Sequence, residues 1–372
     1  MFTIHAQNDV YTTSKHTKFS LLTCGPGEEL YTRFGHTALR LHDDSVNIDV
    51  VFNYGLFDFN TPNFYLKFMN GELDYLLGYG SYGRFIASYT RENREVREAE
   101  IILSDNEKEV LWRLLSINLQ PENRAYRYDF FFDNCATRVR DLLFKVKNIP
   151  LPYQPTGVTY RQLLHEKNTS NSWSAQGIDL LLGANTDSIA SVSGRAFLPD
   201  YLEALCKENG LITTPKIVVN PIIEDEENIV NIPNLLFTLL ILLTVLFTIY
   251  ESKQKQLNKW FDITLLIPFI LLSLLFMYMW FISSHLICKW NWNLLWASPI
   301  LIILLISILK EIPAKRIMIQ LALVDATLVA FIMLSIFAIE YFSNIAYLSA
   351  ATLAIRVNYR LYYTYNLTFR KK

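Results

Sequence analysis

Cysteine is scarce in this 372-residue sequence, and so is net charge. Four cysteines without a C-x-x-C pair exclude a disulfide framework and a zinc site built from paired cysteines. A formal net charge of −1 excludes a nucleic-acid-binding protein built on a basic surface. Repeats and low-complexity segments are absent, and the composition gives no indication of disorder. What remains is a folded chain that is long enough for two domains.

The small net charge conceals two halves of opposite sign. Residues 1–228 contain 22 Lys and Arg against 30 Asp and Glu, a net charge of −8. Residues 229–372 contain 12 against 5, a net charge of +7. A change of polarity and charge sign at one point predicts a boundary between a soluble domain over 18–228 and a membrane domain over 229–372.

The extreme N-terminus, residues 1–17, is expected to be an extension that retains part of a signal peptide. The small residue Ala6 precedes a polar stretch that starts at Gln7, but Met1–Gln7 lacks a full apolar region and a basic start. A truncated signal peptide is therefore predicted, and an uncleaved start is the alternative.

Five apolar runs in the second half are long enough, or nearly so, to cross a membrane, because about 20 residues in a helix span the hydrocarbon core. They cover 232–250, 261–284, 292–309, 317–339 and 341–357. Buried helices of a soluble core would need polar faces, which these runs lack. The fifth run can span only if Arg356 and Arg360 reach the headgroups. Asp325, a lone carboxylate in the fourth run, predicts a polar partner or a functional role.

Basic residues set the expected orientation. They are concentrated in the loops at 251–259 and 310–316 and in the tail after 355, whereas the other two loops contain only Lys289. The basic segments all fall on one side, which is therefore predicted to be cytoplasmic. With five spans, residues 1–228 then lie outside the cytoplasm.

The first half has a mixed α and β pattern. Strands are expected at 18–24, 36–42 and 47–54, and helices at 104–119 and 135–146. The helix at 104–119 begins with Ser104, and Glu107 is placed to complete a capping box.

Cys135 is the candidate nucleophile because it follows Asp-Asn at the start of a predicted helix. Unpaired N–H groups and the helix dipole favour a thiolate there. A thiol nucleophile also needs a base held by a third polar group. His36 begins an apolar strand and Asn53 lies on the next strand, so these two side chains are the candidates. By spacing alone, however, a cysteine on an amphipathic helix more often packs in a core.

Other polar residues are candidates for substrate binding by their proximity to these motifs. They are Glu28, Tyr31 and Arg33 before the histidine, Asn134 and Arg138 around the cysteine, and His285, Asn291 and Asn293 in a loop expected at headgroup depth. The tryptophans of that loop fit an ordinary interfacial belt equally well. No metal site is expected, since no Cys/His cluster has ligand spacing.

The sequence around these residues resembles a known family. The similarity is carried by CGPGEELYTRFGHTALRL, FNYGLFDF and YDFFFDNCATRVRDLL, and it extends into the apolar half. These segments resemble the Lnb family of lipoprotein N-acyltransferases and, more distantly, the permuted NlpC/P60 and lecithin–retinol acyltransferase group. Thr32 stands where the family pattern has Ser. The resemblance implies an α+β, permuted papain-like extracytoplasmic domain followed by a five-helix transmembrane bundle in a bacterial inner membrane, with His36 and Cys135 as the catalytic pair.

The same resemblance implies an enzyme without a cofactor. It would move an acyl chain from a membrane phospholipid, through a thioester on Cys135, to the N-terminal amine of a diacylglyceryl lipoprotein. Three alternatives stay open: an NlpC/P60-like cell-wall peptidase or amidase, a phospholipase with the same two residues, and a receptor without catalysis.

Overall fold

The computed structural model describes residues 11–167, 172–222 and 231–369. The chain forms two compact units, Met1–Val158 with Ile189–Asp225, and Thr159–Ser188 with Glu226–Lys372. They are called the α+β unit and the helical unit below. Met1–Gln7 and the predicted boundary at residue 228 lie outside the described residues.

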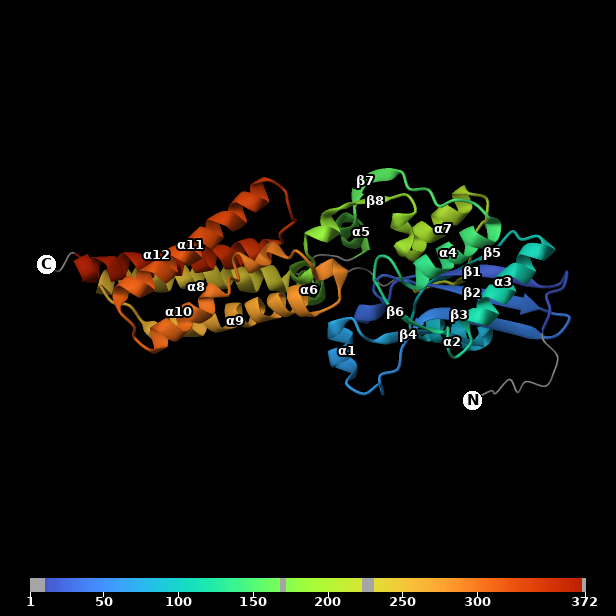
Figure 1. Ribbon diagram of the computed structural model, residues 1–372, viewed down its shortest axis with the longest axis horizontal. Coiled ribbons are helices and arrows are strands. Elements are labelled where there is room, and N and C mark those ends of the chain that lie inside the picture. Colours follow the sequence, from blue (N-terminus) through green and yellow to red (C-terminus); the bar gives the residue numbers. More distant parts are fainter. Residues whose placement is uncertain (1–10, 168–171, 223–230, 370–372) are drawn as a thin grey trace. The chain divides into compact units, whose positions relative to one another are not determined.

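A seven-stranded antiparallel sheet is the framework of the α+β unit (Figure 1). Its order is β6-β4-β3-β2-β1-β5-β9. The strands are β1 (Lys18–Cys24), β2 (His36–Asp43), β3 (Ile48–Leu56), β4 (Asp74–Ser81), β5 (Val96–Glu100), β6 (Ala125–Arg127) and β9 (Lys216–Val219). A second sheet pairs β7 (Pro155–Thr159) with β8 (Ile189–Ser191).

Helices cover both faces of the large sheet because its central strands are apolar on both sides. One face packs against α3 (Asp105–Asn118), α4 (Cys135–Lys147) and α7 (Pro199–Glu208), through residues such as Leu39 and Phe52. The opposite face, which includes Ala38 and Val51, packs against α2 (Tyr82–Arg91). The short helix α1 (Phe64–Asn70) lies between β3 and β4 in the chain.

Several sequence expectations are confirmed in this unit. Strand β1 occupies the predicted 18–24, and α4 begins at the predicted Cys135. The capping box of Ser104 and Glu107 is present at the start of α3. Strand β4 and helix α2, in contrast, were not expected.

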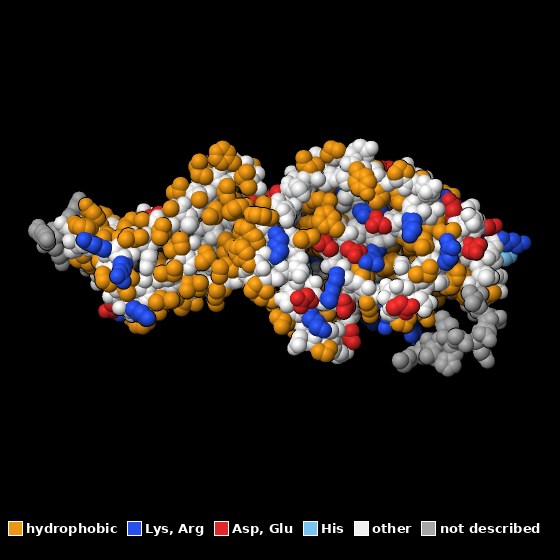
Figure 2. Space-filling view, viewed as in Figure 1, with side chains coloured by type: hydrophobic (Ala, Val, Ile, Leu, Met, Phe, Trp, Pro, Cys, Tyr) orange, Lys and Arg blue, Asp and Glu red, His pale blue; other side chains and the backbone are white. Residues whose placement is uncertain are grey.

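Helices dominate the second unit. They are α5 (Tyr160–Lys167), α6 (Trp173–Leu181), α8 (Ile232–Gln254), α9 (Lys259–Met277), α10 (Ile300–Leu309), α11 (Ala314–Ile336) and α12 (Asn344–Phe369). Apolar side chains cover much of α8 to α12, whereas acidic and basic side chains are interspersed over the α+β unit (Figure 2). Among the described residues, three helices are long and apolar enough to cross a membrane: Ile232–Gln254, Lys259–Ile282 and Ala314–Ile336.

The third and fifth predicted spans look different in the structure. The third becomes α10, whose ten residues rise only about 15 Å as a helix. The fifth becomes the 26-residue α12, which is longer and more polar than predicted. Asp325 has a polar partner there, because Asn358 on α12 donates a 3.0 Å hydrogen bond to its carboxylate.

The segment Thr159–Ser188, expected in the soluble domain, belongs to the helical unit. Its backbone pairs with the loop before α10: Gly183 N–H donates to Ile287 at 2.9 Å, and Ala184 N–H donates to Trp290 at 3.1 Å. A side chain at Gly183 would lie 2.0 Å from the carbonyl oxygen of Lys289, so the close approach requires glycine.

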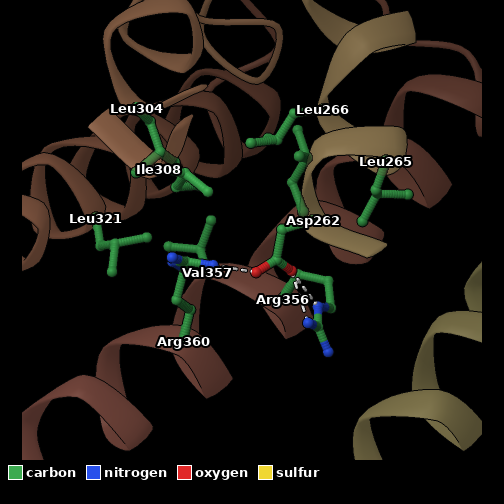
Figure 3. A pocket seen from close by; sticks show the side chains of 10 residues that line it. Asp262, Leu265, Leu266, Leu304, Ile308, Leu321, Arg356, Val357 and Arg360 are labelled. Atoms are coloured by element: carbon green, nitrogen blue, oxygen red, sulfur yellow. Dashed lines mark hydrogen bonds and ion pairs between the residues drawn. The ribbon is translucent and has the colours of Figure 1, made fainter. Parts of the chain in front are cut away.

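Four charged side chains are buried together in this unit: Glu251, Asp262, Arg356 and Arg360. Figure 3 shows the last three of them. Arg356 donates to Asp262 and to Glu251 at 2.6 Å each, and Arg360 donates to the second oxygen of Asp262. The two arginines of α12 pair with acidic residues of α8 and α9. Two positive and two negative charges balance, and the pairs tie three helices together.

Replacing Asp262 by Asn should therefore destabilise the helical unit. The change leaves one buried arginine charge without a counter-charge, which costs roughly 3–5 kcal/mol. Unfolding of the purified full chain in mixed micelles measures the loss. Glu311→Gln is the control, because the Lys259–Glu311 pair is exposed, and this variant should unfold like the wild type. Equal stability of all three proteins would contradict a structural role for the cluster.

Candidate active site

The N-terminus of α4 holds Cys135. Its cap is Asn134, whose side-chain oxygen accepts 2.9 Å hydrogen bonds from the N–H groups of Ala136 and Thr137. The amide nitrogen of the same side chain donates to the carbonyl oxygens of Phe130 and Phe197. Both the oxygen and the nitrogen of the Asn134 side chain are thus hydrogen-bonded, and Asn134 fixes the first turn of the helix that begins with Cys135.

His36 and Asn53 come to Cys135 from two neighbouring strands. His36 opens β2, and its Nε2 lies 3.1 Å from Oδ1 of Asn53 on β3. An amide oxygen can only accept, so Nε2 carries the hydrogen. The other ring nitrogen is then left for Cys135, to which the histidine is also hydrogen-bonded. The three side chains proposed from the sequence therefore form one connected group.

Electrostatics in this group favour a charged pair. Burial by itself raises the pKa of Cys135, but the charge of His36 and hydrogen bonds from His36 and from the backbone of Thr37 and Ala136 outweigh it, so the pKa is lowered. Burial by itself lowers the pKa of His36, and Arg94 acts in the same direction. The Cys135 charge and the bonds to Cys135 and Asn53 outweigh both, so the pKa is raised. Both shifts favour transfer of the thiol proton of Cys135 to the His36 ring.

The other three cysteines have the opposite character. Burial raises the pKa of Cys24, Cys206 and Cys288 to about 12 each. Cys135 is buried as well, with 8% of its surface exposed. Burial is common to all four cysteines. Cys135 therefore differs from the other three through its position at a helix terminus and its contact with His36.

The predicted substrate-binding residues near the motifs fall into two groups. Glu28 and Tyr31 are exposed, and Arg33 is half-buried, on the loop that leads into β2. Asn134 and Arg138 are instead held in the protein: the former caps α4, and the latter donates to Asp133 at 2.6 and 2.8 Å. Asn134 and Arg138 therefore stabilise the start of α4 next to Cys135.

The predicted headgroup-contacting residues lie in the helical unit. Asn291 and Asn293 are buried, and the Asn291 side chain donates to the carbonyl oxygen of Leu180 at 2.7 Å. Asn293 accepts a 2.8 Å hydrogen bond from the Trp296 indole. Burial raises the pKa of Glu340, which accepts from Trp292 N–H, to about 8. His285 is half-buried. These bonds hold the loop around residue 290 together.

Two residues beside Cys135 were not identified from the sequence. Gly55 on β3 has a φ of +89°, at an irregularity in the pairing between β3 and β4. Tyr126 on β6 is buried, and its ring lies under the Arg138 guanidinium at 3.7 Å. A glycine within a strand is the only sequence signal for Gly55, because such a glycine often marks a bulge or a close approach.

No cluster of three or more His, Cys, Asp or Glu side chains able to hold a metal ion occurs among the described residues. The arrangement of Cys135, His36 and Asn53 is suited to nucleophilic chemistry by a thiolate.

Two family models match the chain. The model of the Lnb N-terminal periplasmic domain matches residues 6–166, and the model of the Lnb transmembrane domain matches residues 224–368. Neither the curated proteins nor the solved structures contain a match to the chain.

Alkylation of Cys135 should extend to pH values below the ordinary thiol pKa of about 8.5. A thiolate exists above its pKa, so lowering the pKa widens the reactive range toward acid. In His36→Ala burial dominates, the pKa of Cys135 rises, and the rate at neutral pH falls. Carbamidomethylation of each cysteine by iodoacetamide, followed by mass spectrometry against pH, tests this, with Cys24 and Cys206 as internal controls. Identical Cys135 profiles in both proteins would contradict the pairing.

Proposed function

This chain belongs to the Lnb family and is a membrane protein with a periplasmic N-terminal domain, and on that premise we propose that it is a lipoprotein N-acyltransferase with a cysteine nucleophile. The single observation that carries the mechanism is the connected group of Cys135, His36 and Asn53 at the start of α4. A site of this kind forms an acyl-thioester and passes the acyl group to an acceptor.

In the first half-reaction the Cys135 thiolate attacks an ester carbonyl of a membrane phospholipid. His36 holds the proton that left the thiol, and Asn53 keeps its ring oriented. The carbonyl electron pair moves to the oxygen and returns as the carbon–oxygen ester bond breaks. The leaving lysophospholipid alkoxide takes the proton from His36, and an acyl-thioester remains on Cys135.

In the second half-reaction the neutral α-amine of a diacylglyceryl lipoprotein attacks the thioester. His36, now without its extra proton, accepts one from the amine as the new carbon–nitrogen bond forms. The carbon–sulfur bond breaks and returns the Cys135 thiolate. The products are an N-acylated lipoprotein and the starting enzyme.

An exposed apolar surface near the site supports a lipid donor. Phe59, Tyr65 and Leu66, on α1 and the loop before it, are between 53% and 77% exposed. Contiguous exposed apolar side chains mark binding surfaces for lipids or proteins. Phe57 connects this surface inward, with ring contacts to Phe59 at 5.0 Å and to Tyr75 at 5.5 Å.

Tyr75 continues the aromatic connection by stacking on Tyr128 at 4.5 Å. Tyr128 in turn lies beside Gly55, next to Cys135. We call the surface with these rings the aromatic track. It offers an acyl chain apolar contacts from the protein surface to the sulfur, which a hydrophilic cell-wall peptide would not need. This favours acyl transfer or phospholipid hydrolysis over a peptidase or amidase.

The chain order of the site supports a permuted papain-like arrangement, since the histidine strand and the asparagine strand precede the cysteine helix. The basic loops support a cytoplasmic C-terminus and a five-span bundle in the bacterial inner membrane. In that topology the sulfur faces the periplasm, where both lipid substrates are accessible.

Cys135→Ala should abolish N-acylation of lipoproteins. Without the sulfur no thioester forms, and no other described cysteine has a lowered pKa. Mass spectrometry of a lipoprotein N-terminus from cells that carry either protein measures the third acyl chain. Cys206→Ala is the matched control and should behave as the wild type. Triacylated product in cells whose only transferase is the Cys135→Ala protein would overturn the mechanism, and lysophospholipid formation alone would indicate a phospholipase.

Polar substitutions on the aromatic track should slow acyl transfer from bilayer phospholipids. In the double variant Phe59→Ser/Tyr65→Ser the chain loses apolar contacts, so KM for phospholipid in proteoliposomes should rise several-fold. Alkylation of Cys135 by iodoacetamide should stay unchanged. Tyr153→Ser is the control, because Tyr153 is 73% exposed on the same unit but lies outside the track. An unchanged KM in the double variant would exclude a lipid-binding role for the surface.

A further inference from the structure

One buried hydroxyl near the nucleophile has no hydrogen-bond partner. The side-chain oxygen of Tyr126 is shielded from solvent and, within the described part of the chain, meets neither a donor nor an acceptor. Tyr126 as a whole is only 7% exposed. Leaving a buried hydroxyl unpaired costs about 1–3 kcal/mol, so such groups are rare unless they have another role. The nearby Tyr54 hydroxyl, in contrast, accepts a 2.8 Å hydrogen bond from Asn118.

The hydroxyl faces a small space that Gly55 leaves open beside the sulfur. A carbon atom placed as a side chain on Gly55 would lie 3.8 Å from the Tyr126 oxygen and 3.9 Å from Cβ of Cys135. Both distances are ordinary van der Waals contacts, so the space accepts one such atom without a clash. The carbonyl group of an acyl chain joined to Cys135 would need room of this size.

The N–H groups of the helix turn after the nucleophile are already engaged. Ala136 and Thr137 both donate to the side chain of Asn134 at 2.9 Å, and the backbone of Ala136 also hydrogen-bonds to Cys135. Thiol acyl transfer passes through a tetrahedral oxyanion that needs preorganised donors. A side-chain donor opposite the helix can donate the hydrogen bond to the oxyanion that these two N–H groups do not provide.

Other contacts keep the Tyr126 ring in position. Its strand β6 pairs with β4, where Tyr126 lies opposite Tyr75. The Arg138 guanidinium stacks on the ring, and Asp133 holds that guanidinium through two hydrogen bonds. Burial and the Cys135 charge raise the pKa of Tyr126, so the phenol keeps its hydrogen beside a thiolate. The hydroxyl is therefore a preorganised neutral donor.

We propose that Tyr126 is a catalytic residue whose hydroxyl donates a hydrogen bond to the acyl oxyanion formed on Cys135, in the space that Gly55 leaves open. The inference rests on the proposed acyl-transfer function and adds a residue to it. The hydrogen bond strengthens as negative charge develops on the carbonyl oxygen, and no proton is transferred from the phenol. The same contact serves the formation and the aminolysis of the thioester.

Tyr126→Phe tests the role, because it removes one oxygen and keeps the ring. With p-nitrophenyl butyrate and the purified full chain, the burst of p-nitrophenolate that accompanies thioester formation should slow by on the order of 10²–10³-fold. KM and alkylation by iodoacetamide should stay near wild type, since alkylation develops no oxyanion. Tyr54→Phe is the control: it loses a bonded hydroxyl, so it should lose stability and keep its rate. A wild-type burst rate in Tyr126→Phe would overturn the proposal.

Gly55→Ala provides a second, independent variant. Alanine fills the space beside the sulfur, and it also strains a backbone with a φ of +89°. Gly157→Ala is the control for backbone strain, because Gly157 has a similar φ of +78° but no atom lies within 4 Å of the added carbon. Both variants should lose similar thermal stability, while only Gly55→Ala should lose the burst. Equal burst rates in the two would exclude an acyl site at Gly55.

The burst assay needs no lipoprotein, so it tests the role of Tyr126 separately from the identity of the acyl acceptor. A normal burst without N-acylation of a diacylglyceryl lipopeptide would refute the proposed acceptor and leave the role of Tyr126 standing. Wild-type N-acylation together with a normal burst in Tyr126→Phe would refute the role of Tyr126 alone.

Discussion

The contact between the first turn of α4 and the start of β2 is the constraint on which the site depends. A thiol that is buried as deeply as Cys135 would ordinarily be neutral and inert, as the raised pKa values of Cys24 and Cys206 illustrate. Cys135 differs because the helix terminus and the His36 ring meet at its sulfur. Asn134 fixes the helix end and Asn53 fixes the ring, so neither charged partner has to be ordered when a substrate arrives.

The helical unit depends on polar contacts of a different kind. Its helices present apolar surface outward, yet their interior holds the balanced cluster of Arg356, Arg360, Asp262 and Glu251. Such a cluster gains little over apolar packing but specifies which helices are neighbours, because any other pairing leaves a buried charge uncompensated. At another place in the unit, Thr159–Ser188 is joined to the α9–α10 loop by backbone hydrogen bonds. This segment therefore belongs with the helices although it lies among soluble-domain sequence.

Local patterns predicted the elements in which one signal dominates. Strand β1 is a continuous apolar run, and α3 and α4 begin with capping residues, so their starts agree with expectation. Strand β4 contains two glycines and exposed residues and pairs with distant segments, so its local sequence carries little strand signal. The helices of the second half were expected from apolar length, but the ion pairs of Arg356 and Arg360 were not, because their acidic partners lie about 100 positions earlier in the chain.

The sequence by itself determined the candidate groups and the division of the chain: a cysteine at a helix start, a histidine on an apolar strand, and a charge asymmetry between a polar half and an apolar half. These are local properties of residue type and spacing. Only the tertiary structure decided which side chains surround the sulfur. Gly55 and Tyr126 are 71 positions apart in the numbering, and they meet beside Cys135 because β3 and β6 both pair with β4. An unpaired hydroxyl is a property of the surroundings of a residue, so no pattern in the sequence could have revealed it.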